Sequence, residues 1–330
     1  ILANDFSKAY LSALVGELTF VLPEDIAAER KFLKKIDLLD FPGARSREKI
    51  NEQQLGEVLP TILRRGKVAY LFNKYSRSLK ISSVLFCHHN DQKTEPTIGA
   101  SIHNWIENNI GETPEVRAGI LSRTNGIAPL FLICTKFNID LEKTKNDTPD
   151  TISKLDDHWA RFNTTIPKII EPEKWLDEWV TVGGMFTSPC FQNVYLLRDF
   201  YWSAKNRVFD GYSEQLGTVE SAVHTFPEYP NFFSDLRDSF LANSFVRKHF
   251  ATPQQAWDDV ATINNDGSKA IIRNLDAIAE VLDDARKERY MQQLREIRNE
   301  IVSRLSVYYE SEDKGDNNVK IRKITGDIKL

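Results

Sequence analysis

The chain has 330 residues, of which 41% are hydrophobic and 27% charged, and its formal net charge is −4. These values are ordinary for a globular protein, and the length allows two domains. The acidic balance argues against a nucleic-acid-binding protein, which usually presents a basic face, and no segment approaches the roughly 18 consecutive apolar residues of a membrane span. The three cysteines form no C-x-x-C pair, which predicts reduced thiols in a cytoplasmic protein and leaves secretion as an effector open.

The first strand is predicted at Lys35–Asp40, where a short apolar run ends in an acid and a Pro-Gly turn follows. In an open α/β sheet, this arrangement delivers Asp40 to the carboxyl edge, where ligands bind. In phosphoryl-transfer proteins an acid at this place holds Mg²⁺, and the backbone N–H of a following glycine, here Gly43, faces the γ-phosphate. Arg45 comes next and is a candidate charge stabiliser. The alternatives are a buried strand that ends in a capped turn and a solvated basic loop.

Strands then alternate with helices, which predicts βαβ units and a mainly parallel sheet. Further strands are predicted at 81–87, 129–134 and 193–197, and helices at 53–65, 68–75 and 98–110. A helical insertion at about 141–190 interrupts the rhythm. We therefore expect an α/β domain over 1–210, with its sheet flanked by helices.

Beyond residue 210 the strand signal disappears, and an all-helical domain is expected over 211–330. Apolar residues at spacings of three and four run from Ile271 to Tyr308, with a change of phase near Lys287–Tyr290 that suggests a break or a second helix. This apolar face is expected to be buried against the α/β domain. Binding of a partner helix or of a membrane surface is the alternative.

Three motifs follow the order of the nucleotide loops of a G domain. They are D-F-P-G at Asp40–Gly43, T-K-F-N at Thr135–Asn138 and S-A-K at Ser203–Lys205. On this interpretation Asp40 holds the metal, and Gly43 and Arg45 act on the γ-phosphate. Thr135, Lys136 and Asn138 meet the guanine base, and Ser203, Ala204 and Lys205 lie behind it.

The chain departs from the G-domain pattern at two places. Asn138 stands where a carboxylate normally accepts hydrogen bonds from guanine, and Asp140 is the candidate substitute. No phosphate-binding G-x-x-x-x-G-K-[ST] motif occurs in the 330 residues, so we expect that loop upstream of Ile1. His88 and His89, followed by Asp91, also suggest a metal site, although neighbouring residues of a strand point to opposite faces.

The string K-I-D-L-L-D-F-P-G-A-R-S-R, the block R-R-G-K-V-A-Y-L-F-N-K-Y and the strand I-S-S-V-L-F-C carry a family resemblance. Together they resemble the bacterial virulence factors often called SrfC-like. The resemblance implies a large multidomain protein whose N-terminal part is a P-loop GTPase-like domain in the style of dynamin-like GTPases.

The function expected from the motifs and the resemblance is Mg²⁺-dependent GTP binding and hydrolysis. Other domains of the same protein or separate proteins are the expected partners, and membrane contact is left open. The alternative is a degenerate G domain that serves as a non-enzymatic interaction scaffold.

Overall fold

The structure is a computed structural model that describes residues 15, 17–29, 31–40, 55–78, 80–89, 98–170, 174–213, 219–306 and 308. The chain divides into two compact units, 1–282 and 283–330. This division differs from the predicted boundary near residue 210. Helices that follow residue 210 contribute to the same hydrophobic core as the sheet, and therefore belong to the first unit.

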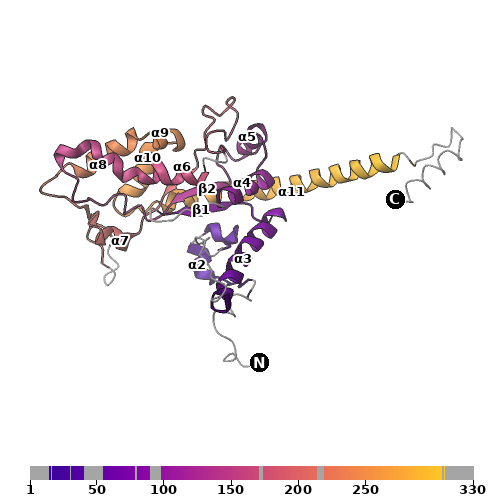
Figure 1. The fold of residues 1–330 in the computed structure, drawn as a ribbon, viewed down its shortest axis with the longest axis horizontal. Coiled ribbons are helices and arrows are strands. Elements are labelled where there is room, and N and C mark those ends of the chain that lie inside the picture. The colour runs from indigo at the N-terminus through magenta and orange to yellow at the C-terminus, as the bar shows by residue number, and fades with distance from the viewer. Residues whose placement is uncertain are drawn as a thin grey trace, which may run out of the picture. The chain divides into compact units, whose positions relative to one another are not determined.

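A three-stranded parallel sheet lies at the centre of the first unit (Figure 1). It consists of β1 (Val84–His88), β2 (Leu130–Cys134) and β3 (Val194–Leu196), in that order. All five residues of β2 are buried, as expected for a central parallel strand that is covered on both faces. The three strands predicted at 81–87, 129–134 and 193–197 are thus confirmed.

Helices make up most of the remaining described chain. They are α2 (Glu24–Glu29), the 3₁₀ helix η1 (Lys31–Lys34), α3 (Leu55–Arg77), α4 (Ile98–Asn109), α5 (Pro114–Arg123), the 3₁₀ helix η3 (Pro149–Trp159), the π-helical segment η4 (Arg161–Thr165), α6 (Ile166–Ile170), α7 (Phe200–Lys205), α8 (Phe232–Ala242), α9 (Ser244–His249), α10 (Pro253–Ala261) and α11 (Ser268–Ser306). In the described ranges, no helix combines the length and the apolar content needed to cross a bilayer.

Several element boundaries differ from the sequence prediction. The two helices expected between residues 53 and 75 are the single helix α3. A two-residue antiparallel pair, β4 (Phe209–Asp210) with β5 (Ala222–Val223), was not predicted. The predicted break near Lys287–Tyr290 is wrong, because α11 continues through it. The segment contains Lys, Glu and Arg, which favour helix, so a change in the phase of the apolar pattern does not end the helix.

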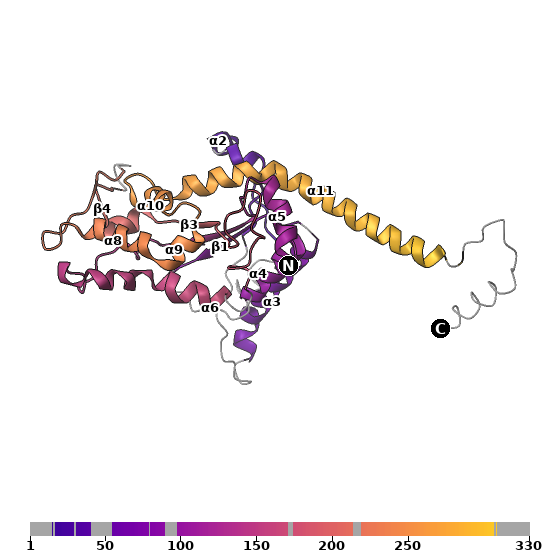
Figure 2. The ribbon, with the colours of Figure 1, turned by 90° about the horizontal axis from the view of Figure 1, so that it is seen from above.

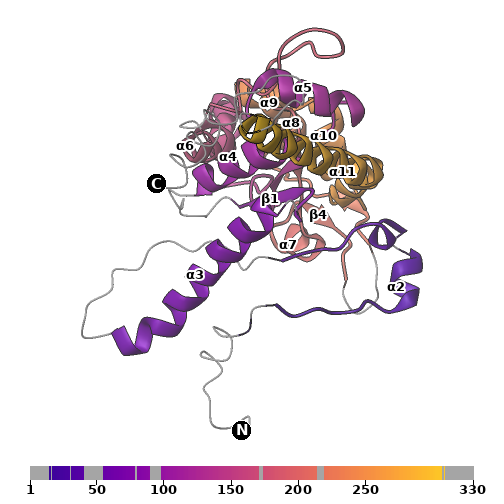
Figure 3. The same cartoon turned by 90° about the vertical axis from the view of Figure 1, so that its right-hand side faces the viewer.

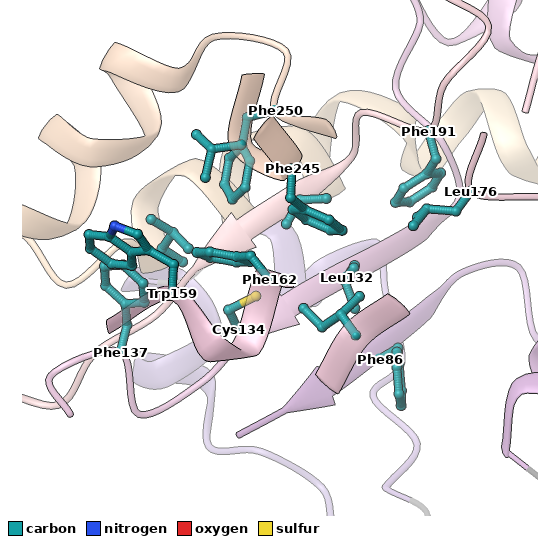
Figure 4. Packing of buried hydrophobic residues seen from close by; sticks show 14 of the residues in the cluster. Phe86, Leu132, Cys134, Phe137, Trp159, Phe162, Leu176, Phe191, Phe245 and Phe250 are labelled. Atoms are coloured by element: carbon teal, nitrogen blue, oxygen red, sulfur yellow. The ribbon is translucent and has the colours of Figure 1, made fainter. Parts of the chain in front are cut away.

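The main hydrophobic core covers one face of the sheet. Leu130, Leu132 and Cys134 of β2 point into it, together with buried residues of α4 such as Trp105. Aromatic side chains from the insertion and from α8 to α10 fill the rest, and Figure 4 shows some of them, including Trp159, Phe162, Phe245 and Phe250. The Trp159 ring lies 5.3 Å from that of Phe240, edge to face, a favourable geometry for aromatic pairs.

The first part of α11 covers the opposite face of the sheet (Figure 2). Phe131 and Ile133, which alternate with the residues of the main core, pack there. Their partners on α11 are Ile271, Leu275, Ile278 and Leu282. Burial of the helical apolar face is therefore confirmed for this part of the helix.

The predicted strand at Lys35–Asp40 is wrong. Residues 36–40 are extended but belong to no strand of the described sheet (Figure 3). Ile36 packs against the α11 side of the sheet, while Leu38 and Leu39 are 63% and 47% exposed. The run is short, and charged residues flank Ile36 on both sides, so only one of its apolar side chains is held in a core.

Candidate functional site

The parallel strands bring several of the predicted site residues to one edge of the sheet. His88 pairs with Cys134 in register, and Cys134 pairs with Leu196. The loop after β2 is fixed at this edge by backbone hydrogen bonds. Thr135 N donates to His88 O over 2.8 Å, and Phe137 N donates to Leu197 O over 3.0 Å. The predicted base-reading loop therefore lies between the ends of β1 and β3.

Within this loop, Lys136 is exposed and Asn138 is buried. Lys136 adopts a left-handed backbone conformation, with φ of 54°, which is uncommon for a residue with a side chain. The Asn138 amide oxygen is buried and has no hydrogen-bond partner in the part of the chain that the structure describes. A buried acceptor without a donor is costly, so this side chain is a candidate for a change of partner when a ligand binds.

Asp140 lies under the loop in a buried ion pair. Its carboxylate accepts from Arg161 Nη2 over 2.7 Å, and neither side chain is exposed. Arg161 Nη1 also donates to the carbonyl oxygens of His88 and Thr135, at 3.1 and 2.9 Å. Burial raises the pKa of Asp140 to about 6, although the Arg161 cation acts in the opposite direction. The carboxylate of Asp140, which was predicted to take the place of the guanine-binding acid, is thus already paired with Arg161.

A second pair of side chains, His158 and Asp147, holds the far end of the same loop. His158 Nδ1 lies 2.9 Å from the carbonyl oxygen of Asp140, and Nε2 lies 3.1 Å from the Asp147 carboxylate. The imidazole thus connects the backbone of Asp140 to the side chain of Asp147. The backbone N–H of Thr144 also donates to Asp147, over 2.6 Å.

Arg161 and His158 lie three residues apart in the insertion, and the sequence analysis selected neither of them. The insertion was expected to pack against the sheet. Nothing in its local pattern showed that these two side chains would support the loop after β2.

The S-A-K motif lies on the short helix α7 rather than in a loop. The Ser203 hydroxyl is buried, donates to Asp199 O over 2.5 Å and accepts from Arg198 Nη1 over 3.0 Å. Ala204 is partly buried, and Lys205 is exposed, with its amine 5.4 Å from the Tyr201 ring centroid. Ser203 is therefore part of the internal packing.

Arg198, two residues after the end of β3, connects this helix to the rest of the unit. Its guanidinium pairs with the buried Glu220 carboxylate, and it also donates to the carbonyl oxygens of Val260 and Asn265, at 2.6 and 2.9 Å.

The helix and the base-reading loop are neighbours at the edge. Asn206, which follows α7, donates to the carboxylate of Glu142, a few residues beyond Asp140. Segments adjoining the second and third predicted motifs are thus in contact.

The first motif is described only as far as Asp40. Asp40 is exposed, and burial together with the Asp40 carboxylate raises the pKa of the Cys87 thiol, so Asp40 lies near the carboxyl end of β1. Gly43 and Arg45 lie outside the described residues. A single exposed carboxylate suits Mg²⁺, which is usually held by one or two carboxylates together with substrate phosphates.

The histidine pair does not form a metal centre in the described part of the chain, where no cluster of three ligand-type side chains occurs. His88 is fully buried, and neither ring nitrogen has a hydrogen-bond partner among the described residues. Burial, with smaller contributions from Arg161 and His89, lowers the pKa of His88 to about 4, so the ring is neutral at physiological pH.

An open hollow of about 590 Å³ lies between η3 and α8. Its lining includes the carboxylates of Asp156, Asp235 and Asp238. Three acids repel a polyphosphate, so this hollow is a poor candidate for the phosphate part of a nucleotide.

The described fold defines an α/β protein with a small parallel sheet, and the segments that follow β2 and β3 meet at the carboxyl edge of that sheet. The family model described as "putative bacterial virulence factor" matches residues 2–328, so the chain belongs to that family. No curated protein and no solved structure matches the chain.

Proposed function

We propose that this chain forms the base-binding and metal-binding part of a purine nucleotide site, with GTP as the first candidate ligand and Mg²⁺ as the cofactor. The observation that carries the proposal is the convergence at one sheet edge of the Thr135–Asp140 loop and α7, with Asp40 near the same edge. Ligands of open α/β sheets bind at this edge.

In this proposal Asp40 reaches the metal, and the exposed stem of Lys136 lies over the base. Asn138 contacts the base after its side chain turns outward. Because its amide oxygen has no partner in the described structure, that turn gives up no described hydrogen bond at this atom. Ala204 and Lys205 form the wall behind the base, while Gly43 and Arg45 act on the γ-phosphate.

The proposal needs a phosphate-binding loop, and the 330 residues contain no G-x-x-x-x-G-K-[ST] motif. Hydrolysis therefore depends on a segment outside them. Without that segment we expect weak, base-directed binding, because most of the affinity of such sites comes from the phosphates and the metal.

The test is a pair of titrations. On the 330-residue chain, saturation-transfer NMR with GMP and AMP detects weak contacts of the base. On a chain that also carries the residues encoded upstream of Ile1, fluorescence titration with labelled GTP and ATP in Mg²⁺ measures the complete site. We expect binding to weaken without Mg²⁺ and in Asp40→Ala. An absence of binding in both experiments would contradict the proposal.

The base assignment has its own control. A guanine edge presents two donors, N1–H and the exocyclic amine, whereas an Asn side chain offers one acceptor. Asn138→Asp supplies the second acceptor and is expected to raise the affinity for GMP relative to AMP. A preference for AMP that survives this change would retain the nucleotide site and remove Asn138 from base recognition.

A non-enzymatic interaction scaffold is the second candidate. It is favoured by the use of Asp140 and Ser203 as internal structural partners and by the exposed apolar residues in the second half of α11.

A further inference from the structure

The second half of α11 carries an apolar stripe that the described structure leaves exposed. Each residue of this stripe has between 36% and 60% of its surface exposed. The full set is Tyr290, Met291, Leu294, Ile297, Ile301, Val302 and Leu305 in α11, with Tyr308 two residues beyond the end of the helix. The first half of the same helix differs from it, since its apolar residues pack against the sheet. Exposed apolar surface of this extent usually marks an interaction site.

The spacing of the stripe is that of one helix face. Five of its members within α11, from Tyr290 to Leu305, follow one another in steps of four, three, four and four residues. At 3.6 residues per turn these steps keep the side chains within a narrow arc, while Met291 and Val302 widen the arc on one side. A stripe of this width is typical of a helix that packs against another helix.

The charges beside the stripe favour a protein helix over a lipid surface. Residues 283–308 contain six basic and five acidic residues, so the segment is almost neutral. Interfacial membrane helices usually carry a predominantly basic polar face. Here the polar face is linked internally, by Arg304 with Glu300 over 2.6 Å and by Gln292 with Glu296 over 2.9 Å.

The order of the residues identifies a partner that fits. Along α11 the central residues of the stripe are Leu294, Ile297, Ile301 and Leu305, and this Leu-Ile-Ile-Leu order reads the same from the other end. In an antiparallel pair centred near residue 299, Ile297 faces Ile301 of a second copy and Leu294 faces its Leu305. This is the self-complementary contact that a two-fold axis requires.

We propose that residues 290–308 form an antiparallel helix-to-helix dimer contact with a second copy of this chain. The available area is sufficient. At on the order of 100 Å² of exposed surface per side chain, eight side chains offer on the order of 800 Å² per copy, which is the contribution of one partner to a standard interface.

Sedimentation velocity on the 330-residue chain, over a concentration series, tests the dimer. The unaltered chain is expected to dimerise, and Ile297→Asp is expected to weaken association roughly 100-fold, because it buries two unpaired carboxylates near the centre of the contact. Ser303→Asp, on the polar face of the same helix, is the matched control and should leave association unchanged. A monomer at every concentration, or equal dimerisation of Ile297→Asp, would overturn the proposal.

Cysteine cross-linking tests the direction. With Cys87→Ser as background, chains carrying Tyr290→Cys are mixed with chains carrying Tyr308→Cys. An antiparallel pair joins the two different chains by a disulfide, and keeps two copies of residue 290 about 27 Å apart, at 1.5 Å per residue. Disulfides between identical Tyr290→Cys chains would instead indicate a parallel pair and contradict the proposed contact. Circular dichroism of each variant controls for loss of helix.

Discussion

Replacement of Arg161 by methionine is expected to destabilise the first unit strongly, because it removes the cation that the structure places beside Asp140. The two side chains are fully buried, and their charged atoms are 2.7 Å apart. Removal of one partner of a buried ion pair leaves an uncompensated charge and costs about 3–5 kcal/mol. The carbonyl oxygen of Thr135 also loses its donor, whereas that of His88 still accepts from the backbone N–H of Thr135.

The double variant Arg161→Met with Asp140→Leu separates the cost of the unpaired charge from the cost of the lost side-chain contacts. It removes both ions, and apolar replacement of a buried pair is often neutral or stabilising. The orphaned Thr135 carbonyl remains, at about 1–2 kcal/mol. We therefore expect the double variant to be more stable than Arg161→Met alone, with a coupling of about 2–3 kcal/mol in a double-mutant cycle.

Urea unfolding followed by tryptophan fluorescence measures this cycle. Burial raises the pKa of Asp140 to about 6, and pH 7.5 lies above this value, so the carboxyl of the unaltered protein is ionised there. At pH 5 its carboxyl is protonated in the variant, so the cost of Arg161→Met should be smaller. Additive single costs, or a cost that does not depend on pH, would refute the argument that the ion pair holds the loop after β2.

Three further predictions concern positions around the sheet. The buried His88 has a pKa of about 4 against an ordinary 6.5, so as the pH falls the unfolded chain binds this proton first and the folded state loses stability. His88→Leu should remove about 2 kcal/mol of the stability loss between pH 7.5 and pH 5. Equal pH dependence of the two proteins would contradict this. Gly267→Ala should lower the free energy of unfolding by more than about 1 kcal/mol, because φ is +91° and a Cβ would overlap the carbonyl oxygen of Leu196 at the end of β3. Gly184→Ala is the control, since φ there is +59° but the space around the glycine is open. An equal effect of both variants on the thermal midpoint would show that the close approach does not matter. Glu220→Gln, which removes the charge of a fully buried ion pair, should cost about 3 kcal/mol in urea unfolding, and a cost near zero would mean that the neighbouring carbonyls alone hold Arg198.

The elements that the sequence predicts well are those whose signal is local and strong. Leu130–Cys134 is a continuous apolar run, and it is the fully buried central strand. The apolar residues of Ile98–Asn109 repeat at helical spacing, and Ile102, Trp105 and Ile106 are indeed buried in α4. In such segments pattern, propensity and burial agree.

The predictions that failed depend on contacts made far along the chain. Lys35–Asp40 has the composition of a strand, but a strand also needs a partner with free backbone groups, and the described sheet provides none for it. The support of the Thr135 loop by Arg161 and His158 joins positions more than 15 residues apart. Neither fact has a counterpart in local periodicity, which is why the sequence analysis named the motif residues and not the residues that hold them.

The two proposed activities can be separated, because they depend on different units of the chain. The nucleotide site uses the sheet edge within 1–282, and the dimer contact uses residues 290–308 of the other unit. Ile297→Asp is therefore expected to weaken the dimer roughly 100-fold while leaving the NMR contacts of GMP unchanged. Asp40→Ala is expected to leave the dimer unchanged and to weaken nucleotide binding in the metal-dependent titration. If Ile297→Asp also removed nucleotide binding, the site would require the second copy, and the sheet edge of one chain would not be sufficient.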